Sequence, residues 1–155
     1  MMSASGYTFI AANWSHDAAT IRAVREPVLI AEMGLAPEQL DTADGHGAFH
    51  ILVYDSAGRP VGTARMQPDG RIDYVVVLRP WRGYTVGSAL LAYLHHIAYA
   101  RKIAHIWAIA PQSARRFFEK NRFVTSAGAA PEIDRHMQKY TRAVSKPGPQ
   151  PAAMH

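Results

Sequence analysis

The sequence predicts a mixed α/β (α+β) fold, with a central sheet of about six to seven strands flanked by about four helices. Three β-rich runs separated by turn-forming residues follow one another at 49–54, 60–66 and 71–78. The apolar pattern then changes to a helical period that reaches about Lys102, with one face made by Val86, Leu90, Leu94 and Ile97. An antiparallel meander that leads into an amphipathic helix indicates a sheet covered by helices.

The N-terminal part predicts a strand, a kinked helix and a polar loop. Thr8–Asn13 has strand character, and Ser15 is expected to cap the helix that follows. Pro27 lacks an N–H group, so we expect it to kink or end that helix, with a second helical piece through Glu32. Pro, Gly and Asp residues between 34 and 47 predict a polar loop or a short helix on the surface.

The C-terminal part predicts further strands and one short helix. We expect a strand at 103–110, a helix at 111–120, and closing strands at 123–125 and 133–142. The Lys-Pro-Gly-Pro-Gln-Pro run predicts a mobile Pro-rich tail at 145–155, which leaves 1–144 as a single domain.

Composition excludes several classes of protein. No stretch stays apolar for the ~20 residues that a membrane span needs. The absence of Cys excludes thiolate nucleophiles and cysteine metal sites, and the start of the chain lacks a secretory pattern, which indicates a cytoplasmic protein. The net charge of +5 favours anionic partners in general, but the basic residues are dispersed, which argues against nucleic acid.

The segment that begins with the third β-rich run carries the strongest functional signal. Tyr74–Leu78 is a run without alternation, which predicts a strand buried on both faces. It leads into a loop with Gly83 and Gly87 and then into the helix, so unpaired N–H groups and the positive helix end meet there. Such a site binds phosphate, and Arg82 adds a cation suited to phosphate oxygens. The spacing is neither that of a P-loop nor that of a dinucleotide fingerprint.

This segment resembles the signature of the GNAT superfamily of acetyl-CoA-dependent N-acetyltransferases, in which Arg/Gln-x-x-Gly-x-Gly/Ala follows a strand. Here it reads Arg82-Gly83-Tyr84-Thr85-Val86-Gly87. The resemblance extends from about 20 to 140 and includes the strand Pro60–Arg65, the run Phe117–Phe123 and Met137-Gln138-Lys139. Val28–Glu32, taken with the Gly-Thr-Ala-Arg strand, is similar to the ElaA-like branch.

The resemblance implies acetyl-CoA as co-substrate and a GNAT-like fold with a strand-loop-helix site for CoA. The pantetheine arm would pair with backbone groups of Val75 and Val77, with the Val77 amide near the thioester carbonyl. The pyrophosphate would lie on the loop at 83–88. The implied CoA-binding residues are Val75, Val76, Val77, Arg82, Gly83, Tyr84, Thr85, Val86, Gly87 and Ser88.

Three positions depart from the family pattern. Thr85 stands at the middle glycine, where a Cβ narrows the approach of the backbone to phosphate unless its φ is negative. Phe118 stands where many members carry the tyrosine that protonates the departing thiolate, so that role is empty or moved. Arg122 replaces a glycine that turns the chain, and we expect this to reshape only a corner.

A general base is needed because an alkylamine must lose a proton before it attacks. Asp73 precedes Val75 and Val77 by two and four residues, so the period of a strand places its side chain on their side. Glu32, by resemblance, matches a glutamate near the acceptor side. Asp73 also reads as a solvated carboxylate at a strand entrance, and Glu32 as a surface carboxylate of a helix.

The histidines do not predict a metal site. His46 and His50 are four residues apart, but the neighbouring glycines disfavour a helix there. We interpret both, together with His95, His96 and His105, as structural or surface residues.

The leading interpretation is an N-acetyltransferase that moves an acetyl group directly to a primary amine in a ternary complex, since no cysteine can carry a covalent intermediate. A second is a catalytically weak acyl-CoA-binding or regulatory module, suggested by Thr85 and Phe118. A third is a small basic nucleic-acid-binding protein, which lacks a basic stripe in this sequence. The expected partners are a small-molecule or peptide amine as acceptor and a second copy of the chain in a homodimer.

Overall fold

The structure follows the predicted order of strands and helices. It is a computed structural model, which describes residues 2–4, 6–40, 44–45, 47–83, 85–125 and 135–141. The predicted tail at 145–155 lies outside the described residues, as do His46 and Tyr84.

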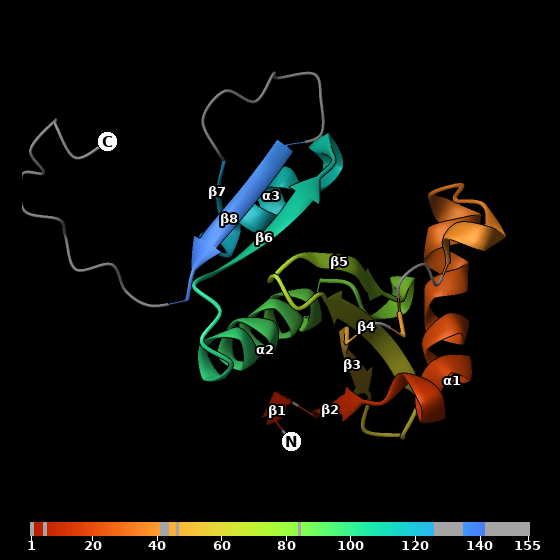
Figure 1. The fold of residues 1–155 in the computed structure, drawn as a ribbon. Coiled ribbons are helices and arrows are strands. Elements are labelled where there is room, and N and C mark those ends of the chain that lie inside the picture. Colours follow the sequence, from red (N-terminus) through yellow and green to blue (C-terminus); the bar gives the residue numbers. More distant parts are fainter. Residues whose placement is uncertain are drawn as a thin grey trace, which may run out of the picture.

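The described strands form two antiparallel sheets (Figure 1). The larger has the order β1-β2-β3-β4-β5 and the smaller the order β6-β8-β7. The strands of the larger sheet are β1 (Met2–Ala4), β2 (Tyr7–Ala12), β3 (Phe49–Tyr54), β4 (Pro60–Met66) and β5 (Ile72–Val77). Those of the smaller sheet are β6 (His105–Ala110), β7 (Val124–Thr125) and β8 (Arg135–Tyr140). The predicted meander is confirmed in β3, β4 and β5, whereas no prediction covers β1.

β5 and β6 are joined at one end. Arg71 forms an isolated parallel bridge with Trp107, and the Trp107 N–H donates to the Gly70 carbonyl at 3.0 Å. Beyond this bridge, no further pairing joins the two strands in the described part of the chain, and β6 pairs along its length with β8. The second half of β5 therefore pairs with β4 on one edge and has an open edge on the other.

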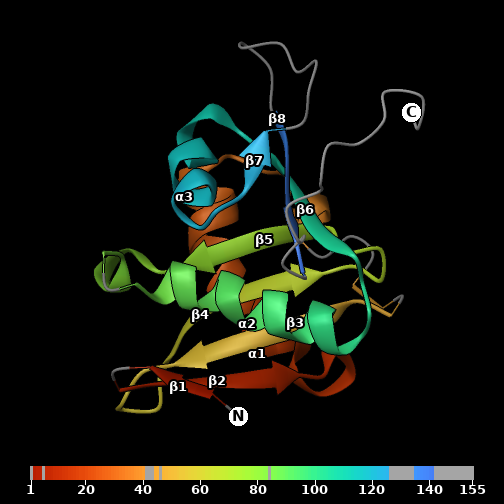
Figure 2. The same ribbon diagram turned by 90° about the vertical axis from the view of Figure 1, so that its left-hand side faces the viewer.

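Helices cover both faces of the larger sheet (Figure 2). α1 (Trp14–Glu26) lies on one face and α2 (Val86–Ala100) on the other, while α3 (Arg115–Lys120) lies beside the smaller sheet. The core on the α1 side contains Ile21, Val24, Val28, Leu29, Leu40, Leu52 and Val76. The core on the α2 side includes Ile51, Val53, Ala64, Leu90 and Leu94. The mixed α/β arrangement expected from the sequence is confirmed.

Two helix boundaries differ from the prediction. Asn13, rather than Ser15, caps α1, because its side-chain oxygen accepts from the Ser15 N–H at 3.0 Å and from the Ser15 hydroxyl at 2.6 Å. At Pro27 the helical path continues as the π-helix η1 (Pro27–Glu32), so the proline changes the helix type without ending it. The short 3-10 turns are η2 (Pro37–Gln39), η3 (Arg79–Trp81) and η4 (Gln112–Ala114).

An ion-pair chain lies on the α1 side of the larger sheet. Arg25 donates to both oxygens of Asp44, at 2.8 and 3.0 Å, and Arg65 donates to Asp44 Oδ1 at 3.0 Å. Arg65 also donates to both oxygens of Asp73, at 2.7 Å each. Burial acts to raise the pKa of Asp44, but the bonds from Arg25 and Arg65 outweigh it and hold that pKa below its ordinary value.

His50 is buried next to this chain. Its ring stacks on Trp14 with centroids 5.3 Å apart, and its Nε2 lies 3.2 Å from the Asp44 carbonyl oxygen. Burial lowers the pKa of His50 below its usual value, although contacts with Asp44 oppose this. The folded state therefore favours the neutral imidazole.

We predict that the protein loses stability as the pH falls through the range in which free histidine titrates. Below about pH 6.5 His50 is protonated in the unfolded chain, whereas the folded state disfavours its protonation. The contribution of His50 to the free energy of unfolding is therefore complete above that pH and is lost below it. One such group changes the free energy of unfolding by at most about 1.4 kcal/mol per pH unit. Urea unfolding from about pH 7.5 to pH 5 measures the slope of the unfolding free energy.

The matched variants are His50→Leu and His96→Leu. His96 is exposed on α2, so His96→Leu should keep the slope of the wild type, whereas His50→Leu should reduce it. An unchanged slope in His50→Leu would show that His50 is not held neutral.

Candidate active site

The end of β5 and the start of α2 border a cavity of about 280 Å³. After Val77 the chain turns through η3, and Gly83 takes a φ of +85°, which glycine adopts without strain. The lining residues are Val75, Val77, Trp81, Arg82, Gly83, Thr85, Val86, Gly87, Ser88, Phe117 and Lys120. Among the described residues predicted to bind CoA, Val76 alone does not line this cavity, because its side chain is buried in the α1-side core.

The same cavity limits the burial of β5. The sequence predicts a strand buried on both faces. Only the face that carries Val76 is covered, and Val76 is 1% exposed. Val75 and Val77 are half-buried, because their side chains face the cavity rather than a continuous core.

The start of α2 supplies backbone N–H groups to this cavity. The first N–H groups of a helix have no partner within it and carry the positive end of the helix dipole. Thr85 precedes the helix, and its side chain makes no capping hydrogen bond to it. Gly87 lies against Phe117, since a Cβ added at Gly87 would come within 3.0 Å of that ring. The arrangement is one that binds anions.

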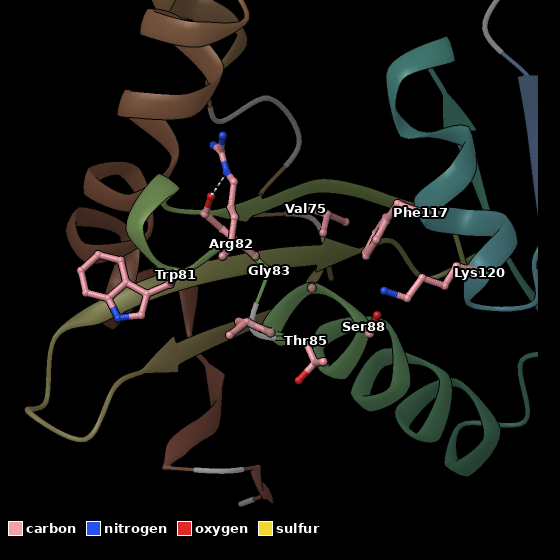
Figure 3. Close-up of a pocket in the computed structure, with 11 residues that line it drawn as sticks. Val75, Trp81, Arg82, Gly83, Thr85, Ser88, Phe117 and Lys120 are labelled. Atoms are coloured by element: carbon pink, nitrogen blue, oxygen red, sulfur yellow. Dashed lines mark hydrogen bonds between the residues drawn. The ribbon is translucent and has the colours of Figure 1, made fainter.

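The open edge of β5 also faces this region. The Leu78 N–H donates to the Val61 carbonyl of β4 at 2.9 Å. Because backbone groups alternate between the two edges of a strand, those of Val77 point away from β4, toward the side where β6 has diverged. The Val77 carbonyl accepts a hydrogen bond from Arg82 Nε at 2.8 Å (Figure 3). The Val77 N–H is thus directed to the open edge.

Arg82 and Glu32, predicted for different roles, are bound to each other. Arg82 donates to the two carboxylate oxygens of Glu32 at 2.8 Å each, and Arg79 adds a bond at 3.2 Å. The bond from Arg82 is the main reason why the pKa of Glu32 is lowered, and the charges of both arginines add to it. Glu32 does not line the cavity, and its lowered pKa makes it a weaker base than an unpaired carboxylate.

Lys120 supplies a further cation at this cavity, and the sequence analysis did not identify it as a site residue. It comes from α3, and its side chain extends toward Ser88 at the start of α2, whereas the Arg82 guanidinium points away from Ser88 and is bound to the Val77 carbonyl and Glu32 (Figure 3). The signal was present in the sequence, because Lys120 lies within the Phe117–Phe123 run that resembles the family. An anion at the helix start would therefore lie beside the Lys120 side chain.

A second, mostly apolar cavity of about 330 Å³ adjoins the first, because Val75 and Phe117 line both. Phe118 lines this second cavity and is 6% exposed, with its ring packed edge-on against Phe117 and Phe123. Phe118 is therefore part of the core as well as of the cavity wall, and it has no proton to donate.

A third cavity, of about 760 Å³ and open, adjoins the second, since Leu35, Arg71, Asp73 and Tyr74 line both. Its other lining residues include Gln39, Gln67, Asp69 and Trp107. The three cavities thus follow one another from the start of α2, past the open edge of β5, to a polar rim. Below they are called the anion, central and polar cavities.

Asp73 lies where the central and polar cavities meet, but not by simple strand alternation. Arg65 pairs with Asp73 and Thr63 with Val76, so β5 carries an extra residue at this point. This bulge breaks the period, and the Asp73 carboxylate is bound by Arg65 instead of lying in phase with Val75.

The described residues contain no cluster of three His, Cys, Asp or Glu side chains able to hold a metal ion. Of the predicted structural histidines, His95 lies 3.0 Å from the Tyr140 carbonyl and His105 contacts the Tyr140 ring. In the same described ranges, none of the helices has the length and apolar character of a membrane span.

Comparison with known proteins identifies the family. A model described as an acetyltransferase (GNAT) domain matches residues 17–136, which is most of the chain. The chain belongs to the GNAT acetyltransferase family. The protein is therefore an acyltransferase of the GNAT type. Its strand-loop-helix cavity lies within the matched residues, at the segment that resembles the family signature.

Solved GNAT structures share this fold. A Lactobacillus plantarum protein assigned to the N-acetyltransferases aligns with a TM-score of 0.76 at 22% identity, covering 89% of this chain and 100% of its own. GCN5 of Tetrahymena aligns with a TM-score of 0.71 at 10% identity, covering 90% and 98%. An acyl-CoA N-acyltransferase of Pseudomonas aeruginosa gives 0.68 at 15% identity, covering 85% and 97%. No curated protein matches the chain.

Two residues that stand where the GNAT pattern has glycine adopt a backbone conformation that favours glycine. Thr85 has a φ of +64° and Arg122 a φ of +69°, both in the left-handed region. A residue with a side chain costs about 1–2 kcal/mol there, and a β-branched residue is especially unfavourable. The loop and the corner thus retain their geometry at the expense of local strain.

We predict that Thr85→Gly raises the melting temperature. Glycine removes the penalty of about 1–2 kcal/mol for a left-handed backbone in the folded state. Its greater conformational freedom stabilises the unfolded chain and offsets about 0.4–1 kcal/mol of this gain. The net gain should be up to about 1 kcal/mol, measured by thermal and urea unfolding. Thr85→Ala is the matched control, because it keeps a Cβ and therefore keeps the strain; a gain as large as that of Thr85→Gly would contradict this explanation.

Proposed function

We propose that the protein transfers an acetyl group from acetyl-CoA to a primary amine by direct attack in a ternary complex. The observation that carries this proposal is the row of three adjoining cavities, with an anion site at one end and Asp73 at the other. A thioester substrate with a pyrophosphate fits the first two cavities, and an amine fits the third. The narrower assignment to the ElaA-like branch is part of the proposal.

The proposed binding mode of acetyl-CoA uses both charge and backbone. The pyrophosphate lies on the amides at 86–88 beside Lys120, where the helix dipole and the lysine charge favour an anion. The pantetheine arm lies along the open edge of β5 at Val75 and Val77. The Val77 N–H then points at the thioester carbonyl, whose oxygen gains negative charge during the reaction.

The reaction forms a C–N bond and breaks a C–S bond and an N–H bond. The amine nitrogen attacks the carbonyl carbon, the C–N bond forms, the C–S bond breaks and the thiolate leaves, while the amine loses a proton. Phe118 donates no proton, so the thiolate takes one from water or leaves unprotonated; a thiol of pKa about 8.5 is a good leaving group near neutral pH.

Asp73 is better placed than Glu32 to receive the amine. Asp73 lines the central and polar cavities, whereas Glu32 lines none of the three. Each oxygen of Asp73 accepts one bond from Arg65 and keeps a second lone pair for an incoming N–H. We therefore assign to Asp73 the orientation of the amine and a share of its deprotonation.

A second candidate function is an acyl-CoA-binding module with weak or no catalysis. The observation that favours it is that Asp73 and Glu32 are both bound by arginine in the structure, and Phe118 carries no hydroxyl. Both functions require CoA to bind, and they differ in turnover.

Turnover separates the two functions. We predict that acetyl-CoA releases free thiol in the presence of at least one member of a panel of small-molecule and peptide amines. Asp73→Asn should lower kcat at least about tenfold, the usual scale for loss of a positioned acid or base. Glu26→Gln, an exposed carboxylate at the end of α1 that lines none of the three cavities, is the control and should retain activity. CoA binding without thiol release for every amine would favour the binding module.

We also predict that Lys120→Met weakens CoA binding about tenfold, because a charged contact between ammonium and phosphate is lost. Lys102→Met is the matched control, since Lys102 is exposed at the opposite end of α2. Calorimetry with CoA and with pantetheine, which lacks the pyrophosphate, separates contacts to the pyrophosphate from contacts to the pantetheine arm. Lys120→Met should leave pantetheine binding unchanged, and an equal loss for both ligands would show that Lys120 does not contact the pyrophosphate.

A further inference from the structure

The bulge in β5 places Tyr74 in an unfavourable backbone conformation. Ala64 stands opposite two residues of β5, Tyr74 and Val75, and Tyr74 has a φ of +49°. An aromatic residue in the left-handed region costs about 1–2 kcal/mol, and neither neighbour of Tyr74 is a glycine that would favour such a bulge. Tertiary contacts must therefore hold Tyr74 in place.

Two buried arginines supply those contacts. The guanidinium carbon of Arg25 lies 4.5 Å from the centre of the Tyr74 ring, and that of Arg65 lies 4.2 Å from it. Both side chains are almost completely buried, at 0% and 5% exposure. Cation–π contacts strengthen when the cation is desolvated, to about 2 kcal/mol or more. The Tyr74 hydroxyl also donates to the Gln39 carbonyl, which fixes the far end of the ring.

The two arginines would repel each other without the carboxylates between and beside them. Asp44 bonds to both, and Asp73 bonds to Arg65, so the formal charges of the four groups cancel. The group therefore joins α1 through Arg25, β4 through Arg65 and the β5 bulge through Asp73 and Tyr74. The proposed mechanism uses Asp73 but gives no role to Arg25, Arg65 or Asp44.

We propose that Arg25 and Arg65 are positioning residues for the acyl-CoA slot, because they clamp the Tyr74 ring and thereby hold the β5 bulge. The bulge sets the direction of the Val75 backbone on the open edge, and it turns Asp73 toward Arg65 at the junction of the central and polar cavities. Without the clamp, β5 would relax toward regular extended backbone and its edge would no longer match a bound pantetheine arm. The proposal rests on the proposed function only in assigning CoA to this slot.

The test compares two substitutions of the ring. Tyr74→Leu removes the surface that the guanidinium groups contact, whereas Tyr74→Phe keeps the ring and removes only the hydroxyl. We expect Tyr74→Leu to weaken CoA binding about tenfold by calorimetry and Tyr74→Phe to stay within about threefold of the wild type. In the ¹H–¹⁵N spectrum, Tyr74→Leu should shift the Val75 and Val77 amides, and Tyr74→Phe should leave them close to their wild-type positions.

A stability control separates positioning from general destabilisation. Ile21→Val shortens a fully buried side chain in the same core and costs about 0.5–1.5 kcal/mol while leaving the Tyr74 ring and both arginines unchanged. It should bind CoA as the wild type does. Wild-type affinity in Tyr74→Leu, or equal losses in Tyr74→Leu and Ile21→Val, would overturn the proposal.

The outcome is also distinguishable from failure of the proposed function. If the wild type binds CoA but transfers no acetyl group, catalysis is refuted and the clamp is still tested by affinity and amide shifts. If the wild type does not bind CoA, the CoA slot itself is wrong, and with it the positioning role.

Discussion

The parting of β5 from β6 is the constraint on which the candidate site depends. The bridge between Arg71 and Trp107 holds the strands together at one end, and from there β6 commits its hydrogen bonds to β8. The open edge of β5 then has backbone groups that require a partner, because unpaired buried N–H and C=O groups are costly. A ligand that can act as an extra strand satisfies this edge, and the pantetheine arm of CoA, with its amides, is of that kind.

Backbone strain is concentrated around this opening. Of the four described non-glycine residues with positive φ, three lie here: Tyr74 at the bulge, Thr85 before α2 and Arg122 after α3. The fourth, Lys102, follows the other end of α2. Two arginines pack on the Tyr74 ring, while Thr85 precedes α2 and Arg122 follows α3. Strained residues persist where the surrounding structure over-determines them, and they gather at functional sites. Here they shape the strand, the anion cavity and the corner that follows α3.

Local patterns predicted the elements well, but not the contacts between distant residues. The bounds of β3 and β4 follow from strand-forming residues between clear turns, and the anion site follows from a strand, a glycine loop and a helix in succession. The bulge at Tyr74 has no local signal, since its cause is packing against Arg25 and Arg65 from other elements. For the same reason the Arg82–Glu32 pair was not foreseen, and the two residues were assigned separate roles.

The structure of the complex with CoA tests the central claim most directly. We expect the pyrophosphate within hydrogen-bond distance of the amides at 86–88 and beside Lys120, and the pantetheine arm between β5 and β6 with a hydrogen bond to the Val77 N–H. The sulfur should lie near the β5 bulge, at the junction of the central and polar cavities. CoA bound with its arm outside the β5–β6 opening, or with its phosphates away from the start of α2, would contradict this account.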